Sequence, residues 1–233
     1  MSSRPPPAFL PGQCVGLDES ALSLLGEGPL RCHRHALVPW QRLVRAAARD
    51  GLALAAVSAY RGFDAQLAIW NAKWRGERPV LDRAGRAVDM RRLSAAGRME
   101  AILVWSALPG ASRHHWGTEF DVVDRAALPP GYQVRLVPAE YSPGGPFEHL
   151  GGWLDRQLHR HGFHRPYRRD RGGVAPEPWH LSCTAVASEA SRRFRLAHLR
   201  AALETAPMEG RDVVLARLPA LYERFVRRVD RPR

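Results

Sequence analysis

Two short segments about sixty residues apart constrain this chain more than any other feature of its sequence. The first, at 112–121, reads Ser-Arg-His-His-Trp-Gly-Thr-Glu-Phe-Asp, and the second, at 177–180, reads Glu-Pro-Trp-His. Gly117 allows the first segment to turn, and the alternation of apolar and polar residues after it predicts a short strand over 118–123. Residues 179–181 predict another short strand. We therefore expect both segments to be held on stiff elements.

The side chains of these segments are those of a three-ligand zinc site. His114, Asp121 and His180 supply two imidazoles and one carboxylate. Three protein ligands leave the fourth position of Zn²⁺ for water, whose pKa the metal can lower from roughly 15.7 to 7. Glu177 would then take the proton of that water and deliver it to a leaving amine. The pattern predicts one zinc ion and the hydrolysis of a peptide bond.

Three segments together resemble the zinc D,D-peptidases of bacterial cell-wall metabolism, the D-alanyl-D-alanine carboxypeptidase and dipeptidase family. The two segments above match the pattern Ser-x-His-x-x-Gly-x-x-x-Asp followed by Glu-x-Trp-His. A third, Ser-Ala-Tyr-Arg-Gly-Phe-x-x-Gln at 58–66, is similar to the family's Ser-Gly-Tyr-Arg-Ser segment with its later glutamine. The matches occur in the family's order and cover about half of the chain, from Ser58 to Ser182.

The resemblance implies roles for further residues. Arg61 would bind a substrate carboxylate or stabilise the carbonyl oxygen as negative charge develops, because its planar fork donates two parallel hydrogen bonds. Ser112 and Gln66 would orient the terminal residue of the substrate. Tyr141, in a loop rich in glycine and proline, is a further candidate for substrate contact, with ordinary loop packing as the alternative.

The chain departs from the family's pattern at Glu119, where the family commonly has alanine. Positions 119 and 121 share one face of a strand. Glu119 is therefore either an acceptor behind the metal ligands or a competitor of Asp121 as ligand or of Glu177 as base. We expect Asp121 to be the ligand. His115 is a poor candidate for a ligand, since adjacent residues of an extended chain cannot both point at one ion, and a supporting role behind the ligands is the preferred alternative.

The remaining pattern predicts an α+β domain. Helical spacing of apolar residues indicates helices over 37–50, 63–74, 95–105, 146–161, 184–205 and 211–229, the last with a break near Pro219 as an alternative. Strands are expected over 52–58, 118–123, 132–137 and 179–181. The resemblance implies that the small sheet is mainly antiparallel and carries the zinc site between flanking helices. We expect a Pro-rich arm at 1–20, a catalytic domain at 21–190 and a helical extension at 191–233.

The chain is strongly basic, with 35 lysines and arginines against 23 acidic residues and a formal net charge of +12. Lys73 is the only lysine, and the arginines are spread along the chain. Such a charge permits nucleic-acid binding, but the sequence contains none of the usual binding modules. We therefore expect no nucleic-acid partner. The expected partner is a peptidoglycan stem peptide or muropeptide, and the sequence leaves the oligomeric state open.

The sequence also bears on localisation. No window of eighteen residues is continuously apolar, so no transmembrane helix is expected. The amino terminus lacks the apolar stretch of a signal peptide, and three scattered cysteines favour a reducing compartment. As written, the sequence predicts a cytoplasmic protein, with export by a route that it does not show as the alternative.

Three other kinds of function remain open. An endopeptidase or an L,D-carboxypeptidase would keep the zinc site and cleave a different bond. A non-catalytic module would use the zinc only to hold its fold. An arginine-rich nucleic-acid binder is the weakest alternative.

Overall fold

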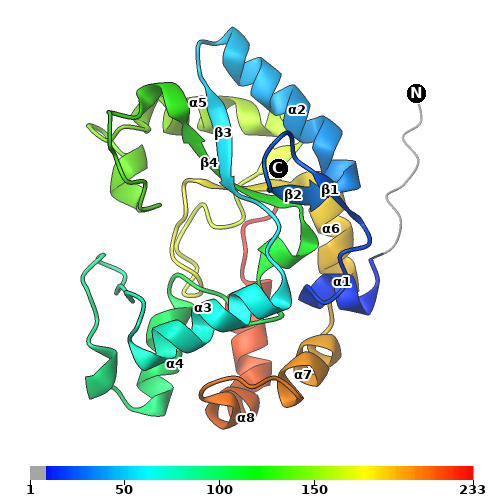
Figure 1. Ribbon diagram of the computed structural model, residues 1–233, viewed down its shortest axis with the longest axis vertical. Coiled ribbons are helices and arrows are strands. Elements are labelled where there is room, and N and C mark those ends of the chain that lie inside the picture. The colour runs from blue at the N-terminus through cyan, green and yellow to red at the C-terminus, as the bar shows by residue number, and fades with distance from the viewer. Residues whose placement is uncertain (1–8, 233) are drawn as a thin grey trace.

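The computed structural model describes residues 9–232, which fold around a four-stranded sheet (Figure 1). The order of its strands is β3-β4-β6-β5, and every neighbouring pair is antiparallel. The strands are β3 (Leu54–Ser58), β4 (Glu119–Asp124), β5 (Phe163–His164) and β6 (His180–Cys183). The mixed α and β architecture with a small antiparallel sheet is therefore confirmed.

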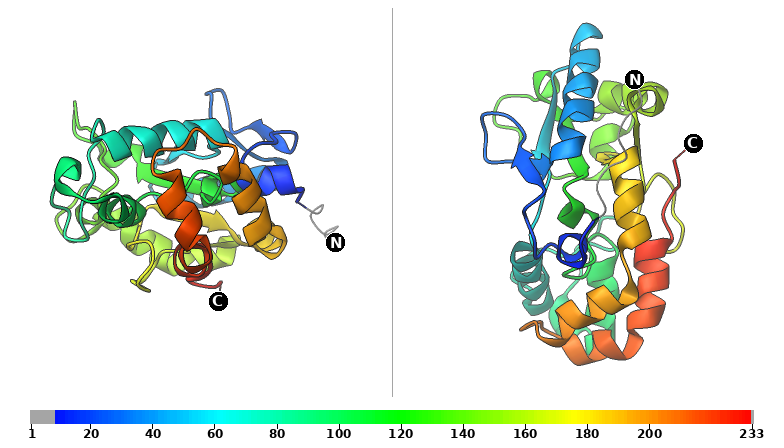
Figure 2. Two further views of the ribbon diagram at one scale, coloured as in Figure 1. Left: turned by 90° about the horizontal axis from the view of Figure 1, so that it is seen from below. Right: turned by 90° about the vertical axis from the view of Figure 1, so that its right-hand side faces the viewer.

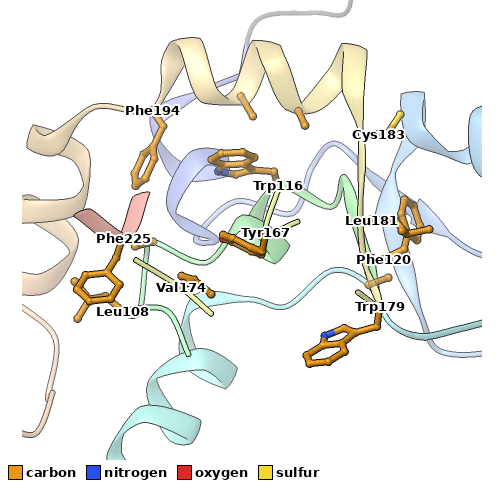
Figure 3. Close-up of a cluster of buried hydrophobic side chains, with 14 of the residues drawn as sticks. Leu108, Trp116, Phe120, Tyr167, Val174, Trp179, Leu181, Cys183, Phe194 and Phe225 are labelled. Atoms are coloured by element: carbon orange, nitrogen blue, oxygen red, sulfur yellow. The ribbon is translucent and has the colours of Figure 1, made fainter. Parts of the chain in front are cut away.

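Strand β4 lies at the centre of the sheet and is buried along its whole length. Its side chains alternate between two faces. Phe120 packs on the core side, where it stacks on Trp40 with ring centroids 4.6 Å apart, and Figure 3 shows Leu181 of β6 beside it. Asp121 points to the other face and lies directly opposite His180 in the pairing of β4 with β6. The same alternation thus builds the core and presents polar side chains on the opposite face.

Helices lie around the sheet and extend the molecule below it. Their bounds are α1 (Pro11–Val15), α2 (Arg34–Arg49), α3 (Phe63–Arg75), α4 (Ala95–Leu103), α5 (Glu148–Gln157), α6 (Thr184–Arg193), α7 (Leu196–Glu204) and α8 (Arg211–Leu221). In Figure 1, α2 and α5 accompany the sheet at the upper end, whereas α3, α4, α7 and α8 occupy the lower end. The right-hand view of Figure 2 shows the same separation of the two groups.

The expected helix over 184–205 is wrong in one respect, because it is two helices. α6 ends at Arg193 and α7 begins at Leu196. Phe194 between them has an extended backbone and is buried, with its ring 6.1 Å from that of Trp116 and 5.6 Å from that of Tyr222 (Figure 3). Burial of this ring turns the chain. Pro219 does not break the last helix, which continues from α8 into a π-helical turn at Tyr222–Arg227.

The expected strand over 132–137 is also wrong, because this segment is an irregular loop. The buried carboxylate of Glu140 accepts hydrogen bonds from the backbone N–H groups of Arg135 and Val137, at 2.9 and 3.2 Å, and from the hydroxyl of Tyr132 at 3.0 Å. Leu136 adopts a positive φ of 53°. The backbone N–H groups of this segment therefore bond to the side chain of Glu140, and the segment does not pair as a regular strand.

The expected Pro-rich arm at 1–20 is wrong for the residues that the structure describes, and residues 1–8 lie outside them. Phe9 and α1 pack into the core, and Cys14 is fully buried. A short hairpin that the sequence analysis missed follows, with strands β1 (Leu22–Leu24) and β2 (Arg31–His33). The carboxy-terminal helices contribute to the same hydrophobic core as the sheet. The domain boundaries at 20 and 190 stay predictions.

Among residues 9–232, no helix combines the length and the apolar character that a membrane span requires.

Candidate metal centre and active-site cleft

The fold brings the three predicted metal ligands together. His114, Asp121 and His180 each offer a ligand atom within 4.8 Å of the other two, and all three are buried. Nε2 of His114 lies 3.3 Å from Oδ2 of Asp121, and Nδ1 of His180 lies 3.3 Å from Oδ1 of the same carboxylate. The sequence motifs and their family resemblance identified these residues, and the pairing of β4 with β6 is what joins Asp121 to His180.

His114 reaches the site from a short 3₁₀ helix, Arg113–Trp116, that ends at Gly117. Gly117 has a φ of 67°, a conformation that other residues rarely adopt. A Cβ at this position would also lie 2.6 Å from the backbone nitrogen of His33. The turn between His114 and the start of β4 therefore requires glycine.

The donor set fits zinc in both its chemistry and its spacing. Ligand atoms that bind zinc at 2.0–2.2 Å in a tetrahedron lie roughly 3.3–3.6 Å from one another, which the two distances to Asp121 match. Oδ1 of Asp121 is buried and has no hydrogen-bond partner among residues 9–232. Burial acts to raise the pKa of Asp121, but the neighbouring rings of His114 and His180 hold it well below its usual value. A buried anionic oxygen without a donor is suited to a cation.

Hydrogen bonds behind the ligands fix both imidazole rings. Nδ1 of His114 lies 2.6 Å from the carbonyl oxygen of Ala59, and Nε2 of His180 lies 2.9 Å from Oε2 of Glu119. Each ring uses one nitrogen for this bond and directs the other at Asp121. Such partners set the tautomer and the orientation of a metal-binding histidine.

Glu119 lies behind His180, where it is an acceptor behind the candidate ligands, the first of the roles considered from the sequence. Its side chain is fully buried, and its Oε1 accepts from Thr118 Oγ1 at 2.8 Å, Ser182 Oγ at 2.9 Å and Arg113 Nη2 at 3.2 Å. Burial acts to raise the pKa of Glu119, but the charge of Arg113 and the bond with His180 lower it. Both carboxylate oxygens are therefore engaged, and Asp121 is left as the candidate carboxylate ligand.

Glu177 stands next to the ligands and lines the same cleft. Its Oε2 lies 3.2 Å from Nδ1 of His180. The backbone N–H of Glu177 donates to the carbonyl oxygen of Tyr167 at 2.9 Å, and its own carbonyl oxygen accepts from the N–H of His180 at 3.2 Å. These two bonds hold the carboxylate beside the metal ligands without making it one of them.

Arg61 enters the cleft from the end of β3. Its Nη1 donates to Oε1 of Gln66 at 2.9 Å, and its Nη2 donates to Oγ of Ser58 at 3.3 Å. Gln66 is buried, and its amide nitrogen donates to the carbonyl oxygen of Ala107 at 2.8 Å. Gln66 therefore lies behind Arg61 and positions it, in place of the substrate contact expected from the sequence.

His115 also positions Arg61; a supporting role was expected for this histidine, but its partner was not. Its Nε2 accepts from the backbone N–H of Gly110 at 3.0 Å, so the proton is on Nδ1, which donates to the carbonyl oxygen of Arg61 at 2.6 Å. Burial lowers the pKa of His115 to about 3, so the ring stays neutral. The only signal in the sequence was its position next to a metal ligand.

The two remaining candidates for substrate contact differ in position. Ser112 lines the cleft, and its hydroxyl does not cap the short helix that follows it. Tyr141 is buried, its ring packs near those of Phe147 and Trp179, and its hydroxyl donates to the carbonyl oxygen of Val122 at 2.5 Å. Tyr141 is not among the residues that line the cleft. The position of Tyr141 therefore fits ordinary loop packing, the alternative to substrate contact.

The cleft itself is a cavity of 980 Å³. Its lining contains the candidate metal ligands, Glu177 and Arg61. Residues of α3 and of the loops at 78–85 and 135–139 complete this lining. Basic side chains outnumber acidic ones in this lining. Its size and charge suit a peptide with one or more carboxylates.

The sequence matches the family profile of the D-alanyl-D-alanine carboxypeptidase VanY over residues 30–186, which is more than half of its 233 residues. The chain belongs to the VanY family. The resemblance inferred from the three motifs is therefore confirmed, and the protein is related to carboxypeptidases that act on peptidoglycan.

The chain is also similar to a curated protein and to solved structures. An uncharacterized protein of Haemophilus influenzae is 34% identical over 121 residues, which cover 51% of this chain and 92% of that protein. The structure of VanYB in complex with D-alanine-D-alanine is similar with a TM-score of 0.50 and 25% identity, and the match covers 79% of this chain and 88% of VanYB. A VanY D,D-pentapeptidase mutant in complex with Zn(II) has a TM-score of 0.50 and 26% identity, over 72% of this chain and 83% of that one.

Replacing Glu119 with glutamine is expected to weaken zinc binding by about 10- to 100-fold, as loss of a carboxylate behind a metal-binding histidine typically does. The amide would also leave the buried Arg113 without its counter-charge, so the free energy of unfolding should fall by about 3 kcal/mol or more. Zinc affinity and thermal unfolding measure the two effects.

The matched control for this substitution is Glu140→Gln. Glu140 is buried to a similar degree and accepts several hydrogen bonds, but it lies outside the site. This control should lower stability and leave zinc affinity unchanged. Equal zinc affinities for the Glu119 variant and the parent protein would contradict the orienting role.

Zinc binding is expected to strengthen with rising pH. Burial acts to lower the pKa of His180, but the surrounding carboxylates of Asp121, Glu119 and Glu177 raise it well above 6.5 in the metal-free protein. Below this raised pKa the ring is protonated, so zinc must displace a proton, and affinity should change by about tenfold per pH unit for each proton displaced. Zinc titrations between about pH 6 and 8 measure this slope. An affinity independent of pH would contradict the prediction.

Proposed function

We propose that the protein is a zinc-dependent D,D-carboxypeptidase that removes the terminal D-alanine from peptidoglycan stem peptides or their precursors. The observation that carries the proposal is the convergence of His114, Asp121 and His180 beside the free carboxylate of Glu177, in one cleft with Arg61. Family membership and the similarity to VanYB, whose structure is known with D-alanine-D-alanine, support the choice of substrate.

Each group in the cleft has a distinct task in this reaction. Bound to His114, Asp121 and His180, zinc would supply a Lewis acid and an acidified water. Glu177 accepts a proton from the attacking water and transfers it to the nitrogen of the scissile amide, so the C–N bond breaks and the terminal amino acid leaves as a free amine.

Arg61 stabilises the carbonyl oxygen of the substrate as negative charge develops on it. Its guanidinium stays protonated throughout the reaction, and Gln66 and Ser58 hold it in place. A donor fixed in advance costs no reorganisation at the transition state. Ser112, whose side chain faces the cleft, is placed to bind a polar group of the terminal residue.

The other candidates fit less well. A module that uses zinc only to hold its fold has no use for a free Glu177 and an Arg61 held by two side chains in the same cleft. An L,D-carboxypeptidase or an endopeptidase would use the same groups, and the shape of the cleft mouth would decide between them. The D,D reaction is favoured because the matching family profile is that of a D-alanyl-D-alanine carboxypeptidase, and a solved structure 26% identical to this chain is a D,D-pentapeptidase by name.

The test is hydrolysis of defined peptides by the zinc-loaded protein, with products identified by mass spectrometry. A pentapeptide ending in D-Ala-D-Ala should lose one alanine, and the same peptide ending in D-Ala-L-Ala should remain intact. A tetrapeptide whose terminal D-Ala follows an L-residue separates the L,D reaction, and an internally cross-linked muropeptide separates the endopeptidase. Failure to cleave the pentapeptide when zinc is bound would refute the proposal.

A further inference from the structure

Lys73, the only lysine of the chain, projects from α3 into the candidate active-site cleft. Its side chain is half-buried, and its Nζ donates a hydrogen bond to Oγ of Ser106 at 2.5 Å. Within residues 9–232 no carboxylate lies within ion-pair distance of this ammonium. A half-buried cation that faces a cavity without a counter-charge is unusual for a purely structural residue.

Two further cations lie near Lys73 in the same lining, Arg61 and Arg78. Burial, together with the charges of Arg78 and Arg61, lowers the pKa of Lys73 to about 8, and the charge of Glu177 only partly opposes this shift. Arg78 is exposed, and in the described part of the chain its guanidinium forms neither an ion pair nor a side-chain hydrogen bond. Three cations that repel one another across a cavity would be stabilised by an anion between them.

Within residues 9–232, no acidic residue of the cleft forms an ion pair with Lys73, Arg61 or Arg78, although the charge of Glu177 acts on Lys73 from beyond ion-pair distance. Asp121 faces His114 and His180, and Glu177 faces His180. Arg83, a further cation of the lining, is paired with Asp170. Lys73 and Arg78 are therefore available to pair with an anionic group of a bound ligand.

Lys73 is held close to the group that stabilises the reacting carbonyl. Gln66, Ile69 and Lys73 are spaced by three and four residues and so share one face of α3. Two hydrogen bonds fix this face to neighbouring residues. Lys73 donates to Ser106 Oγ, and Gln66 donates to the carbonyl oxygen of Ala107. Since Gln66 also holds Arg61, Lys73 lies on the same helix as the residue that positions Arg61.

We propose that Lys73 and Arg78 form a carboxylate-binding subsite in the cleft that holds an acidic group of the peptide substrate. The identity of the peptide rests on the proposed function. Lys73 has three N–H donors and uses one for Ser106, so two remain for a carboxylate, and Arg78 adds a fork at the mouth of the cleft. The carboxylate is either the carboxy terminus of the peptide or an acidic side chain within it.

The first experiment uses the parent protein and its single lysine. An amine-selective reagent such as acetic anhydride at about pH 8 should acetylate Lys73 and the amino terminus, and peptide mapping by mass spectrometry reads the two sites separately. A peptide ending in D-Ala-D-Ala should reduce acetylation of Lys73 several-fold and leave the amino terminus unaffected. Its C-terminal amide, and a peptide whose acidic side chain is a carboxamide, identify which carboxylate protects. Equal acetylation of Lys73 with and without all of these peptides would overturn the subsite.

The second experiment measures kinetics with Lys73→Met, Lys73→Arg and a control, Arg42→Met, which removes one exposed charge on α2. Lys73→Met should lower kcat/KM for the acidic peptide by about 10- to 100-fold, mainly through KM, as expected for loss of a hydrogen bond to a charged group. Hydrolysis of the peptide that lacks the recognised carboxylate should change little, and Lys73→Arg should restore part of the loss. Equal losses for the acidic and the amidated peptides would overturn the subsite.

The two proposals fail separately. If the zinc-loaded protein cleaves no peptide but an acidic peptide still protects Lys73, the carboxypeptidase reaction is wrong and the subsite stands. If the protein cleaves the peptides but no carboxylate protects Lys73, the reaction stands and the subsite is wrong.

Discussion

Replacing Glu177 with glutamine is expected to lower kcat by about 10² or more while zinc remains bound, because the amide cannot accept the proton of the attacking water. Glutamine has nearly the same size and keeps an oxygen that can face Nδ1 of His180. The rate is measured on a peptide ending in D-Ala-D-Ala, and the zinc content of the same sample is measured by metal analysis.

A suitable control for this prediction is Glu223→Gln, which neutralises an exposed carboxylate in the π-helical turn far along the chain from the cleft motifs. It should leave both rate and zinc content unchanged. Loss of zinc from the Glu177 variant with an unaffected rate per bound zinc would refute its role as base and assign it to metal binding.

Removal of the metal is expected to abolish turnover and to lower thermal stability. Without a cation, Asp121 retains a buried oxygen that no donor in the described chain satisfies. At a free zinc concentration of about 1,000 times Kd, binding to the folded state alone contributes roughly 4 kcal/mol to the free energy of unfolding. Dialysis against a chelator, followed by activity and thermal unfolding measurements, should show both losses, and added zinc should reverse them.

His114→Ala and Asp121→Ala give the corresponding result by mutation, since each removes one ligand from the site. In these variants added zinc should restore neither activity nor stability to the parent values. Magnesium serves as the control ion, because it prefers an octahedral set of oxygen ligands and should not replace zinc at two imidazoles and one carboxylate. Full activity in protein shown to be free of metal would contradict the zinc site.

The metal ligands were predictable because each carries a local signal. His114 and Asp121 flank a glycine turn and a strand with a clear period of two, and His180 follows Trp179 in a second short strand. The pairing of those strands could not be predicted from either segment, since it depends on contacts between residues about sixty positions apart. Family resemblance supplied what the periodicity lacked.

The errors have equally local causes. The alternation over 132–137 is real, but Glu140 takes the backbone donors that a neighbouring strand would have needed. The long helix expected over 184–205 is interrupted because burial of Phe194 outweighs helical continuity. Glu119 has partners on its own segment and on β6. Its contact with His180 depends on the register of β4 with β6, which the sequence did not give.

The adjacent positions Phe120 and Asp121 on β4 have a consequence for the fidelity of folding. A shift of the strand by one residue would exchange the two faces along its whole length. The acid would then press against Trp40, and an aromatic ring would fill the place of a ligand. A chain folded in the wrong register would therefore lose its core packing and its candidate metal site together. The stability of the core thus selects the same register that assembles the site.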